Sequence, residues 1–368
     1  MAKRVCVITC VHSPDDSRIY QKEIRSLARA GYEVIFINPF REGVDNLGVK
    51  HIKVEIPKGR VARFIKAPGL IYKKAKTVEA EIYHLHDPEL LPVGVKLAKD
   101  AKVIFDSHED TTLQTLSKPW LPAFIRSPSA KIYAHREKRT SLKLTAIVAA
   151  TENIEDVFKK YGCQKTVTIK NYPLLEEFSE PADWSQKQRR VCYVGGITKI
   201  RGIYEMLDAL ESTDIRLSLA GTFENRELEE AVKNHPGFIE NTDYFGQVGR
   251  DKVVEILSSS IAGLVVLYPE PNYINSLPIK MFEYMAAGIP IVFSDFPFWR
   301  SLAIKDENSV CGIAVDPHDP EQIRKAVLFI AEHPEKARQW GENGLRLARE
   351  VFNWKAEEKK LLALYRSL

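Results

Sequence analysis

Short runs of β-branched residues alternate with helix-length amphipathic segments along the whole chain. This alternation is typical of parallel sheets covered by helices, so we expect an α/β fold. The predicted strands of the first half are residues 4–10, 33–37, 51–56, 82–86, 102–106, 146–150 and 166–170. Those of the second half are residues 191–196, 217–221, 242–246, 262–268, 289–294 and 311–315.

The length of 368 residues suggests two domains, at roughly 150 residues each. Residues 171–190 are polar, contain two prolines and show no clean period, so we interpret them as the linker. We predict two Rossmann-like, doubly wound domains over residues 1–172 and 173–351, with a last helix at about 352–368 that crosses back to the first domain. Because ligands of such sheets bind at the carboxyl ends of the strands, the two domains would face a central cleft.

The formal net charge of +4 is unevenly divided along the chain. Residues 1–170 hold 30 basic and 19 acidic residues, whereas the remainder holds 23 and 30. The five cysteines are scattered and show no metal-ligand spacing, which is typical of a reduced cytoplasm. The N-terminus does not fit a signal peptide, and no apolar run is long enough to span a membrane. We therefore expect a cytoplasmic protein that could bind the inner face of the plasma membrane peripherally.

The most specific stretch is PEPNYINSLPIKMFEYMAAGIPIV, residues 269–292. A strand leads into a loop, Pro278 stands at the expected first helical position, and the helix ends near Gly288. The free amides and positive dipole end of that helix suit an anionic group such as a diphosphate. Glu283 lies about one and a half turns further along, where its carboxylate could accept hydrogen bonds from two vicinal hydroxyls. The candidate contacts at the helix start are Asn275, Ser276, Leu277 and Pro278.

A second candidate is the loop YVGGITKIRG, residues 193–202. Gly195 and Gly196 directly follow a strand, and glycines there allow the backbone to approach a ligand closely. Lys199 and Arg201 come before the next helix, so the loop combines exposed amides with positive charge. This combination favours a phosphate-bearing ligand.

Polar residues also follow the predicted strands of the first half. His108 lies just after strand 102–106, and its alternatives, His84 and His86, lie at the end of strand 82–86. Such positions point toward a ligand site, because the carboxyl ends of parallel strands share one edge of the sheet. The first loop adds His12, Asp16 and Arg18.

These motifs resemble glycosyltransferase family 4, whose members are retaining enzymes of the GT-B fold. The segment around Glu283 is similar to the family pattern Gly-x-Pro-x-x-Glu-Ala-Met-Ala. Eight residues earlier, where the family has another glutamate, this chain has Asn275. In the glycine loop, Arg201-Gly202 matches a Lys-Gly pair of the family, whereas Gly196 stands at the position of an arginine.

The resemblance implies an enzyme of bacterial polysaccharide or glycolipid synthesis that uses a nucleotide-diphospho-sugar, and we expect a UDP-sugar. Glu283 would hold the ribose, and Arg201 with Lys199 would neutralise the diphosphate. His108 would lie beside the donor sugar, with Asn275 in place of the glutamate that contacts this sugar. No Asp-x-Asp motif occurs, and the resemblance implies that neither a metal ion nor another cofactor is needed.

The first domain would bind the acceptor, a hydroxyl of a lipid-linked or cell-surface glycan precursor. Two alternatives stay open. A UDP-sugar 2-epimerase on the same fold would isomerise the nucleotide sugar without an acceptor. A non-catalytic subunit of a polysaccharide assembly pathway would explain why Asn275 replaces a glutamate. The candidate acceptor residues are His12, Asp16, Arg18 and His86.

Residues 56–78 contain seven basic side chains, no acidic one, and apolar side chains between them. Each basic residue near an anionic leaflet contributes on the order of 1 kcal/mol, so this stretch favours a peripheral membrane surface. Residues 119–126 could add apolar contact. No motif for nucleic acid occurs, and we expect no such partner.

Overall fold

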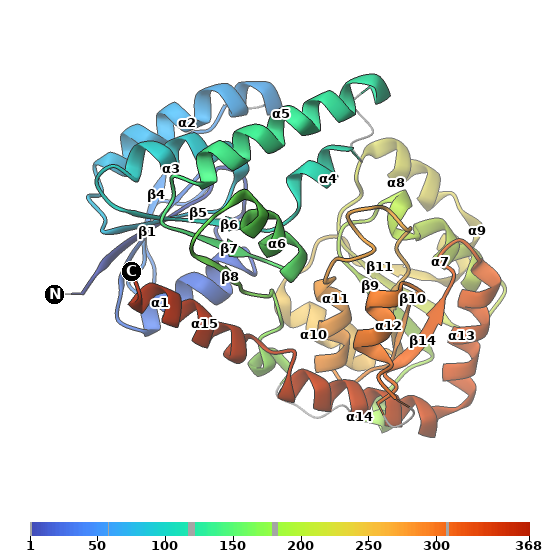
Figure 1. The fold of residues 1–368 in the computed structure, drawn as a ribbon. Coiled ribbons are helices and arrows are strands. Elements are labelled where there is room, and N and C mark those ends of the chain that lie inside the picture. Colours follow the sequence, from blue (N-terminus) through green and yellow to red (C-terminus); the bar gives the residue numbers. More distant parts are fainter. Residues whose placement is uncertain (1, 58, 117–121, 179–182, 307–308) are drawn as a thin grey trace. The chain divides into compact units, whose positions relative to one another are not determined.

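The computed structural model describes residues 2–57, 59–116, 122–178, 183–306 and 309–368. The chain forms two compact units, and Figure 1 labels most of their elements. Unit 1 contains residues 1–171 and 355–368, and unit 2 contains residues 172–354. Each unit is built on its own, largely parallel sheet, which confirms the predicted α/β class.

The sheet of unit 1 has eight strands in the order β3-β4-β2-β1-β5-β6-β7-β8. All neighbouring strands run parallel except β3 and β4, which are antiparallel. In the centre, Val5 of β1 lies opposite Val34 on one side and Ile82 on the other. The strands are β1 (Arg4–Ile8), β2 (Glu33–Asn38), β3 (Gly43–Val44), β4 (Lys50–Lys53), β5 (Ile82–Leu85), β6 (Lys102–Ser107), β7 (Ala146–Ala149) and β8 (Thr166–Thr168).

Helices cover both faces of this sheet (Figure 1), because alternate side chains of each buried strand point to opposite faces. On one face, Ile71 of α2 belongs to the same apolar cluster as Cys6 and Ile8 of β1. A π-helix, Ile19–Ile24, precedes α1 on the other face. The helices are α1 (Arg25–Arg29), α2 (Arg60–Lys76), α3 (Leu91–Leu97), α4 (Thr111–Leu116), α5 (Ala123–Ser141), α6 (Glu152–Tyr161) and α15 (Trp354–Arg366).

The terminal helix α15 packs on unit 1, as the sequence predicted. Tyr365 is fully buried, and its hydroxyl hydrogen-bonds to Nδ1 of His84 at 2.9 Å. Glu357 accepts a hydrogen bond from the backbone N–H of Lys170 at 2.9 Å. The last turns of the chain therefore complete the core and the polar interior of unit 1.

The sheet of unit 2 has six parallel strands in the order β11-β10-β9-β12-β13-β14. Along β9, Cys192 belongs to one apolar cluster and its neighbours Val191 and Tyr193 to another, so both faces are buried. The strands are β9 (Arg190–Val194), β10 (Arg216–Ala220), β11 (Thr242–Tyr244), β12 (Ala262–Val265), β13 (Ile291–Ser294) and β14 (Gly312–Val315).

Eight α-helices among the described residues surround this sheet. They are α7 (Ile203–Leu210), α8 (Arg226–Lys233), α9 (Pro236–Asn241), α10 (Arg250–Ser259), α11 (Ile279–Ala286), α12 (Pro297–Ala303), α13 (Pro320–Glu332) and α14 (Pro334–Glu350). Pro278 is the residue before α11 and not its first helical residue, so the predicted helix start lies one residue too early.

The prediction of a linker at residues 171–190 was wrong in part. Tyr172 and Phe178 are buried in the core of unit 2, where the ring centroid of Tyr172 lies 4.9 Å from that of Phe282. Residues 179–182 lie outside the described residues. The apolar side chains of this stretch therefore outweigh its polar composition and prolines.

We expect Tyr365→Ala to lower the free energy of unfolding of unit 1 by about 3–5 kcal/mol, because it empties a buried aromatic site. Tyr365→Phe, which removes only the hydroxyl bonded to His84, should cost about 1 kcal/mol. Urea unfolding followed by circular dichroism measures both values. Lys359→Ala, on the exposed side of the same helix, is the control. Equal stability of Tyr365→Ala and this control would contradict the packing of α15.

Candidate functional site

The loop after β9 brings two glycines against two cations. Gly195 has a φ of +140°, in the region that favours glycine. A Cβ atom on Gly195 would lie 3.3 Å from Nζ of Lys280, and one on Gly196 would lie 3.0 Å from Nη1 of Arg201. The lack of a side chain at both positions therefore lets the cations lie directly against the backbone of the loop.

Arg201 turns back over this loop from a short 3₁₀ turn, Lys199–Arg201. Its Nη1 donates to the carbonyl of Gly196 at 3.3 Å, whereas its Nε is buried without a hydrogen-bond partner. Lys199, which we predicted to act with Arg201, is exposed. Of the two predicted cations, the structure therefore encloses only Arg201.

Lys280 is absent from the predicted site residues, although it lies in the middle of the motif. From the second residue of α11, its Nζ donates to the hydroxyl of Tyr193 at 3.0 Å and lies 4.0 Å from the centre of that ring. The hydroxyl of Tyr193 donates in turn to the carbonyl of Gly196 at 2.8 Å. Burial, together with the nearby charge of Arg201, holds the pKa of Lys280 well below its usual value. Its spacing of three from Glu283, which puts both on one helix face, is the signal that could have revealed it.

Glu283 also lies on α11, with a side chain that is 12% exposed. Its Oε1 lies 2.8 Å from Nη1 of Arg250, the first residue of α10, and Arg250 also pairs with Glu177. The ion pair orients the carboxylate of Glu283. Arg250 could not be found from the sequence, because it lies 33 positions before Glu283 and carries no motif of its own.

The loop ahead of α11 is held by hydrogen bonds from side chains to its backbone carbonyls. The Ser276 hydroxyl donates to the carbonyl of Tyr273 at 2.9 Å, and the Ser276 carbonyl accepts a hydrogen bond from the Trp299 indole at 2.9 Å. Asn275 is exposed, while Leu277 and Pro278 are half-buried. The predicted residues of this loop are therefore held beside Lys280, with Asn275 free to meet a ligand.

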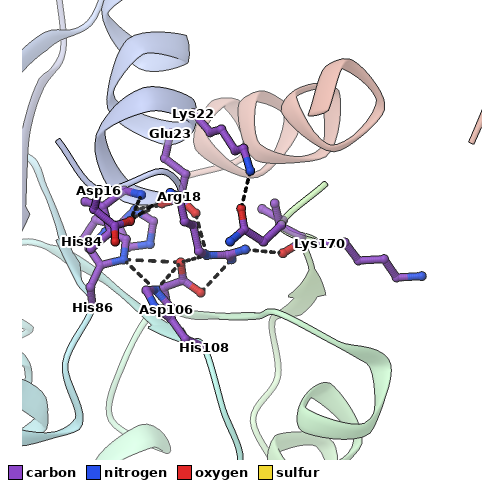
Figure 2. A network of polar contacts seen from close by, with 12 residues as sticks. Asp16, Arg18, Lys22, Glu23, His84, His86, Asp106, His108 and Lys170 are labelled. Atoms are coloured by element: carbon purple, nitrogen blue, oxygen red, sulfur yellow. Dashed lines mark hydrogen bonds and ion pairs between the residues drawn. The ribbon is translucent and has the colours of Figure 1, made fainter. Parts of the chain in front are cut away.

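A second polar cluster lies in unit 1 around the buried guanidinium of Arg18 (Figure 2). Its Nε and Nη2 donate to the two carboxylate oxygens of Asp106 at 2.8 and 2.9 Å, and its Nη1 donates to the carbonyl of Ile169 at 2.8 Å. Arg18 is 3% exposed. These contacts favour a structural role for Arg18 over the acceptor contact that we predicted.

Three of the predicted histidines meet beside Asp106 and at the first loop. Nδ1 of His86 lies 3.2 Å from Nε2 of His108, which lies 3.3 Å from Oδ2 of Asp106. His86 is buried, and this burial lowers its pKa, so its ring is neutral. The ring centroid of His12 lies 5.2 Å from that of His108. The structure thus brings His12, His86 and His108 together.

Only part of this group reaches the surface. The side chains of His12 and Asp16 are 32% and 25% exposed, and that of His108 is 21% exposed. Burial lowers the pKa of His12, but the carboxylates of Asp16 and Asp87 outweigh this effect and raise it above its usual value. His12, Asp16 and His108 can therefore meet a ligand directly, whereas His86 supports them from below.

Glu23 completes the buried side of the cluster. Its Oε1 lies 3.1 Å from Nε of Arg18, yet neither of its oxygens has a hydrogen-bond partner. Burial first, and then the charge of Asp106, raise the pKa of Glu23 well above its usual value. Beside Arg18, the surroundings therefore favour the ionised form of Asp106 and the protonated form of Glu23.

The ligand atoms of four buried residues in this cluster lie within 4.8 Å of one another, which is a spacing that a metal ion can use. The carboxylate of Asp106 is already held by two donors of Arg18. Because the guanidinium supplies the positive charge here, we interpret the group as a hydrogen-bonded network. The four residues are Glu23, His84, His86 and Asp106.

We expect Glu23→Gln, which mimics the protonated side chain, to remove a pH dependence of stability. When folding raises the pKa of a carboxyl group, the group stabilises the folded state fully at pH values below its unfolded pKa of about 4.3. This stabilisation is lost as the pH rises toward the folded pKa. Above pH 5, the free energy of unfolding of the wild type should thus fall by up to about 1.4 kcal/mol per pH unit relative to that of Glu23→Gln. Urea midpoints at pH 5 to 8 measure this difference. Parallel pH profiles for the two proteins would show that Glu23 is ionised.

Comparison with known proteins connects both units to one enzyme class. Residues 17–171 match the family described as Glycosyltransferase Family 4, and residues 176–346 match Glycosyl transferases group 1. D-rhamnosyltransferase WbpZ of Pseudomonas aeruginosa is 27% identical over 234 residues, which cover 60% of this chain and 59% of that protein. The matched stretches span about half the length of the curated relatives, from 44% to 59%.

Solved structures share the whole fold. Sucrose-phosphate synthase from Thermosynechococcus elongatus has a TM-score of 0.78 and 18% identity, covering 99% of this chain and 98% of that one. Anabaena Alr3699/HepE, solved in complex with UDP and glucose, has a TM-score of 0.74 and 14% identity, with both chains covered completely. Two parallel α/β units, two matching family domains and these neighbours show that the chain belongs to the GT-B glycosyltransferases of family 4 type.

Proposed function

We propose that the chain is a retaining glycosyltransferase that moves a sugar from a UDP-sugar to a hydroxyl of a lipid-linked or cell-surface glycan precursor. The observation that carries the proposal is the guanidinium of Arg201, which lies over the glycine loop with a buried, unpartnered Nε. An unpaired buried donor on a cation favours an anionic ligand. The similar fold that was solved with UDP and glucose supports a UDP-sugar as the donor.

The donor is held by unit 2 in this proposal. Arg201 and the amides at the start of α11 bind the diphosphate, since the backbone there offers donors and the helix dipole is positive. The carboxylate of Glu283, oriented by Arg250, accepts hydrogen bonds from the ribose hydroxyls. Asn275 lies exposed beside them and contacts the donor sugar. Lys199 is exposed as well and takes only a peripheral part.

The chemistry follows from the side chains at hand. The acceptor hydroxyl attacks the anomeric carbon on the face that the diphosphate leaves, so the bond to the diphosphate oxygen breaks as the new glycosidic bond forms. The departing oxygen takes the proton of the hydroxyl. An amide such as Asn275 cannot serve as the nucleophile of a double displacement, which favours this single step. Arg201 stabilises the charge that develops on the leaving group, without a metal ion.

In this proposal, unit 1 binds the acceptor. His108, partly exposed and held by Asp106 and His86, contacts the donor sugar. His12 and Asp16, which are also partly exposed, bind the acceptor hydroxyl. The buried network beneath them fixes the rings and tautomers, a task that neutral His86 and the ion pair of Arg18 perform.

We expect Arg201→Ala to lower kcat/KM for sugar transfer by about 100- to 1,000-fold, as for other donors that stabilise a developing anion. Glu283→Ala should lower it at least about tenfold through the donor KM. NMR of the nucleotide sugar, with and without acceptor, measures transfer and also detects epimerisation. Arg226→Ala, with a side chain that is 87% exposed, is the control. Losses below about threefold in both site variants would refute this assignment.

We also propose that unit 1 binds an anionic membrane through the surface formed by α2 and α5. On α2, Phe64, Ile65 and Leu70 are exposed, and Ile65 is 70% exposed. On α5, Phe124 and Ile132 are 81% and 71% exposed. Among the described residues, no helix is both long and apolar enough to cross a membrane. Exposed apolar side chains of this kind favour binding at the interface.

The two helices present this surface together. The guanidinium of Arg136 on α5 lies 5.3 Å from the centre of the Phe64 ring on α2, and Ile132 shares the helix face of Arg136 at a spacing of four. The exposed lysines Lys66, Lys73 and Lys74 supply positive charge. Two expectations change: Ile71 is buried in the core, and Arg63 and Lys76 pair with acidic residues outside residues 56–78. Lys58 and residues 117–121 lie outside the described residues.

We expect Lys73→Gln with Lys74→Gln to weaken binding to vesicles with anionic lipid about 30-fold, since two basic residues contribute about 2 kcal/mol. Vesicle co-sedimentation at low salt measures the affinity, with zwitterionic vesicles beside it. Lys325→Gln, on an exposed lysine of unit 2, is the control. Equal binding to both kinds of vesicle would argue against a charged membrane surface.

A further inference from the structure

The glycine loop of unit 2 holds one enclosed cation where a diphosphate offers two phosphate groups. Arg201 is that cation. Gly196 stands where the resembling sequences carry an arginine, and Lys199 is exposed. The loop by itself therefore provides less positive charge than its ligand would need.

Lys280, on helix α11, supplies the positive charge that the loop lacks. Its Nζ would lie 3.3 Å from a Cβ atom on Gly195, so the ammonium group sits against the loop backbone next to Gly196. The ammonium group donates one hydrogen bond to the hydroxyl of Tyr193, and this hydroxyl donates in turn to the carbonyl of Gly196. Tyr193 thus holds the lysine at the loop and leaves its other donors for a ligand.

Neither cation has an ion-pair partner in the part of the chain that the structure describes, although the charge of Glu283 acts on Lys280. Within the described ranges, no carboxylate forms an ion pair with Lys280 or Arg201, whereas Arg250 on α10 pairs with both Glu177 and Glu283. Two neighbouring cations without a counterion are unfavourable, and an anion that contacts both of them removes the repulsion. This arrangement indicates a site for an anion and not a structural ion pair.

We propose that Lys280 binds the leaving diphosphate together with Arg201 and replaces the arginine that the loop lacks at Gly196. The inference rests on the proposed function and adds one residue to it. As the bond from the anomeric carbon to the diphosphate oxygen breaks, the electron pair stays on that oxygen, which also takes the proton of the acceptor hydroxyl. Lys280 stabilises this charge from the side of α11, and Arg201 from the side of the loop.

The depressed pKa of Lys280 agrees with this role. In the free protein, burial and Arg201 disfavour its charged form. A bound diphosphate would favour the charged form, because an opposite charge at close range raises the pKa of an amine. The protonation of Lys280 would therefore follow the binding and release of the diphosphate.

The test compares UDP with uridine, which lacks the diphosphate, in calorimetric titrations of the full chain. We expect Lys280→Met to raise the Kd of UDP at least about tenfold, and to leave the Kd of uridine within about twofold. A lysine that only supports the fold would weaken both ligands equally. Lys280→Gln, which keeps a polar end, serves as a second variant if Lys280→Met does not fold.

Lys325→Met removes an exposed charge from the same unit and should change neither Kd. Failure of the two proposals can be told apart. If wild type binds UDP no more tightly than uridine, both proposals fail. If wild type discriminates between them and the Lys280 variants discriminate equally well, Lys280 is not the second cation. A loss of discrimination in Lys199→Met alone would assign that charge to Lys199 instead.

Discussion

The polar interior of unit 1 depends on the ion pair between Arg18 and Asp106. A guanidinium that is 3% exposed can persist only if its charge and its donors are satisfied. Its donors reach Asp106 at the end of β6 and the carbonyl of Ile169 beyond β8, so one side chain ties the first loop to two distant segments. The position of His108 follows from this pair, because its ring rests on the same carboxylate.

In unit 2, the enclosed cations have no ion-pair partner among the described residues. These cations, Arg201 and Lys280, lie beside glycines and a tyrosine. The chain as a whole places its basic excess in residues 1–170, yet the site for an anionic donor is proposed in the acidic part. Under the proposed function, the local geometry of unit 2 outweighs its net charge in binding the donor. Arg18 has its counterion within the fold, whereas Arg201 and Lys280 are the cations for which we propose an anionic ligand.

The sequence predicted all the longer strands, because β-branched runs between breakers are a local signal. It missed β3, which has only two residues, and it misread the stretch with Tyr172 and Phe178, whose burial depends on partners far along the chain. The motif around Glu283 could be read directly. The contacts that hold Lys280 and Arg18 could not, because their partners, Tyr193 and Asp106, lie 87 and 88 positions away.

The terminal helix has a consequence for the order of folding during synthesis. Residues 172–354 form unit 2 as one continuous segment, which is complete once residue 354 has left the ribosome. Unit 1 begins earlier but needs residues 355–368, and until they emerge His84 lacks Tyr365. The first unit to be made is thus the last to be completed, and the part of its core that Leu361 and Tyr365 fill stays open while unit 2 is synthesised.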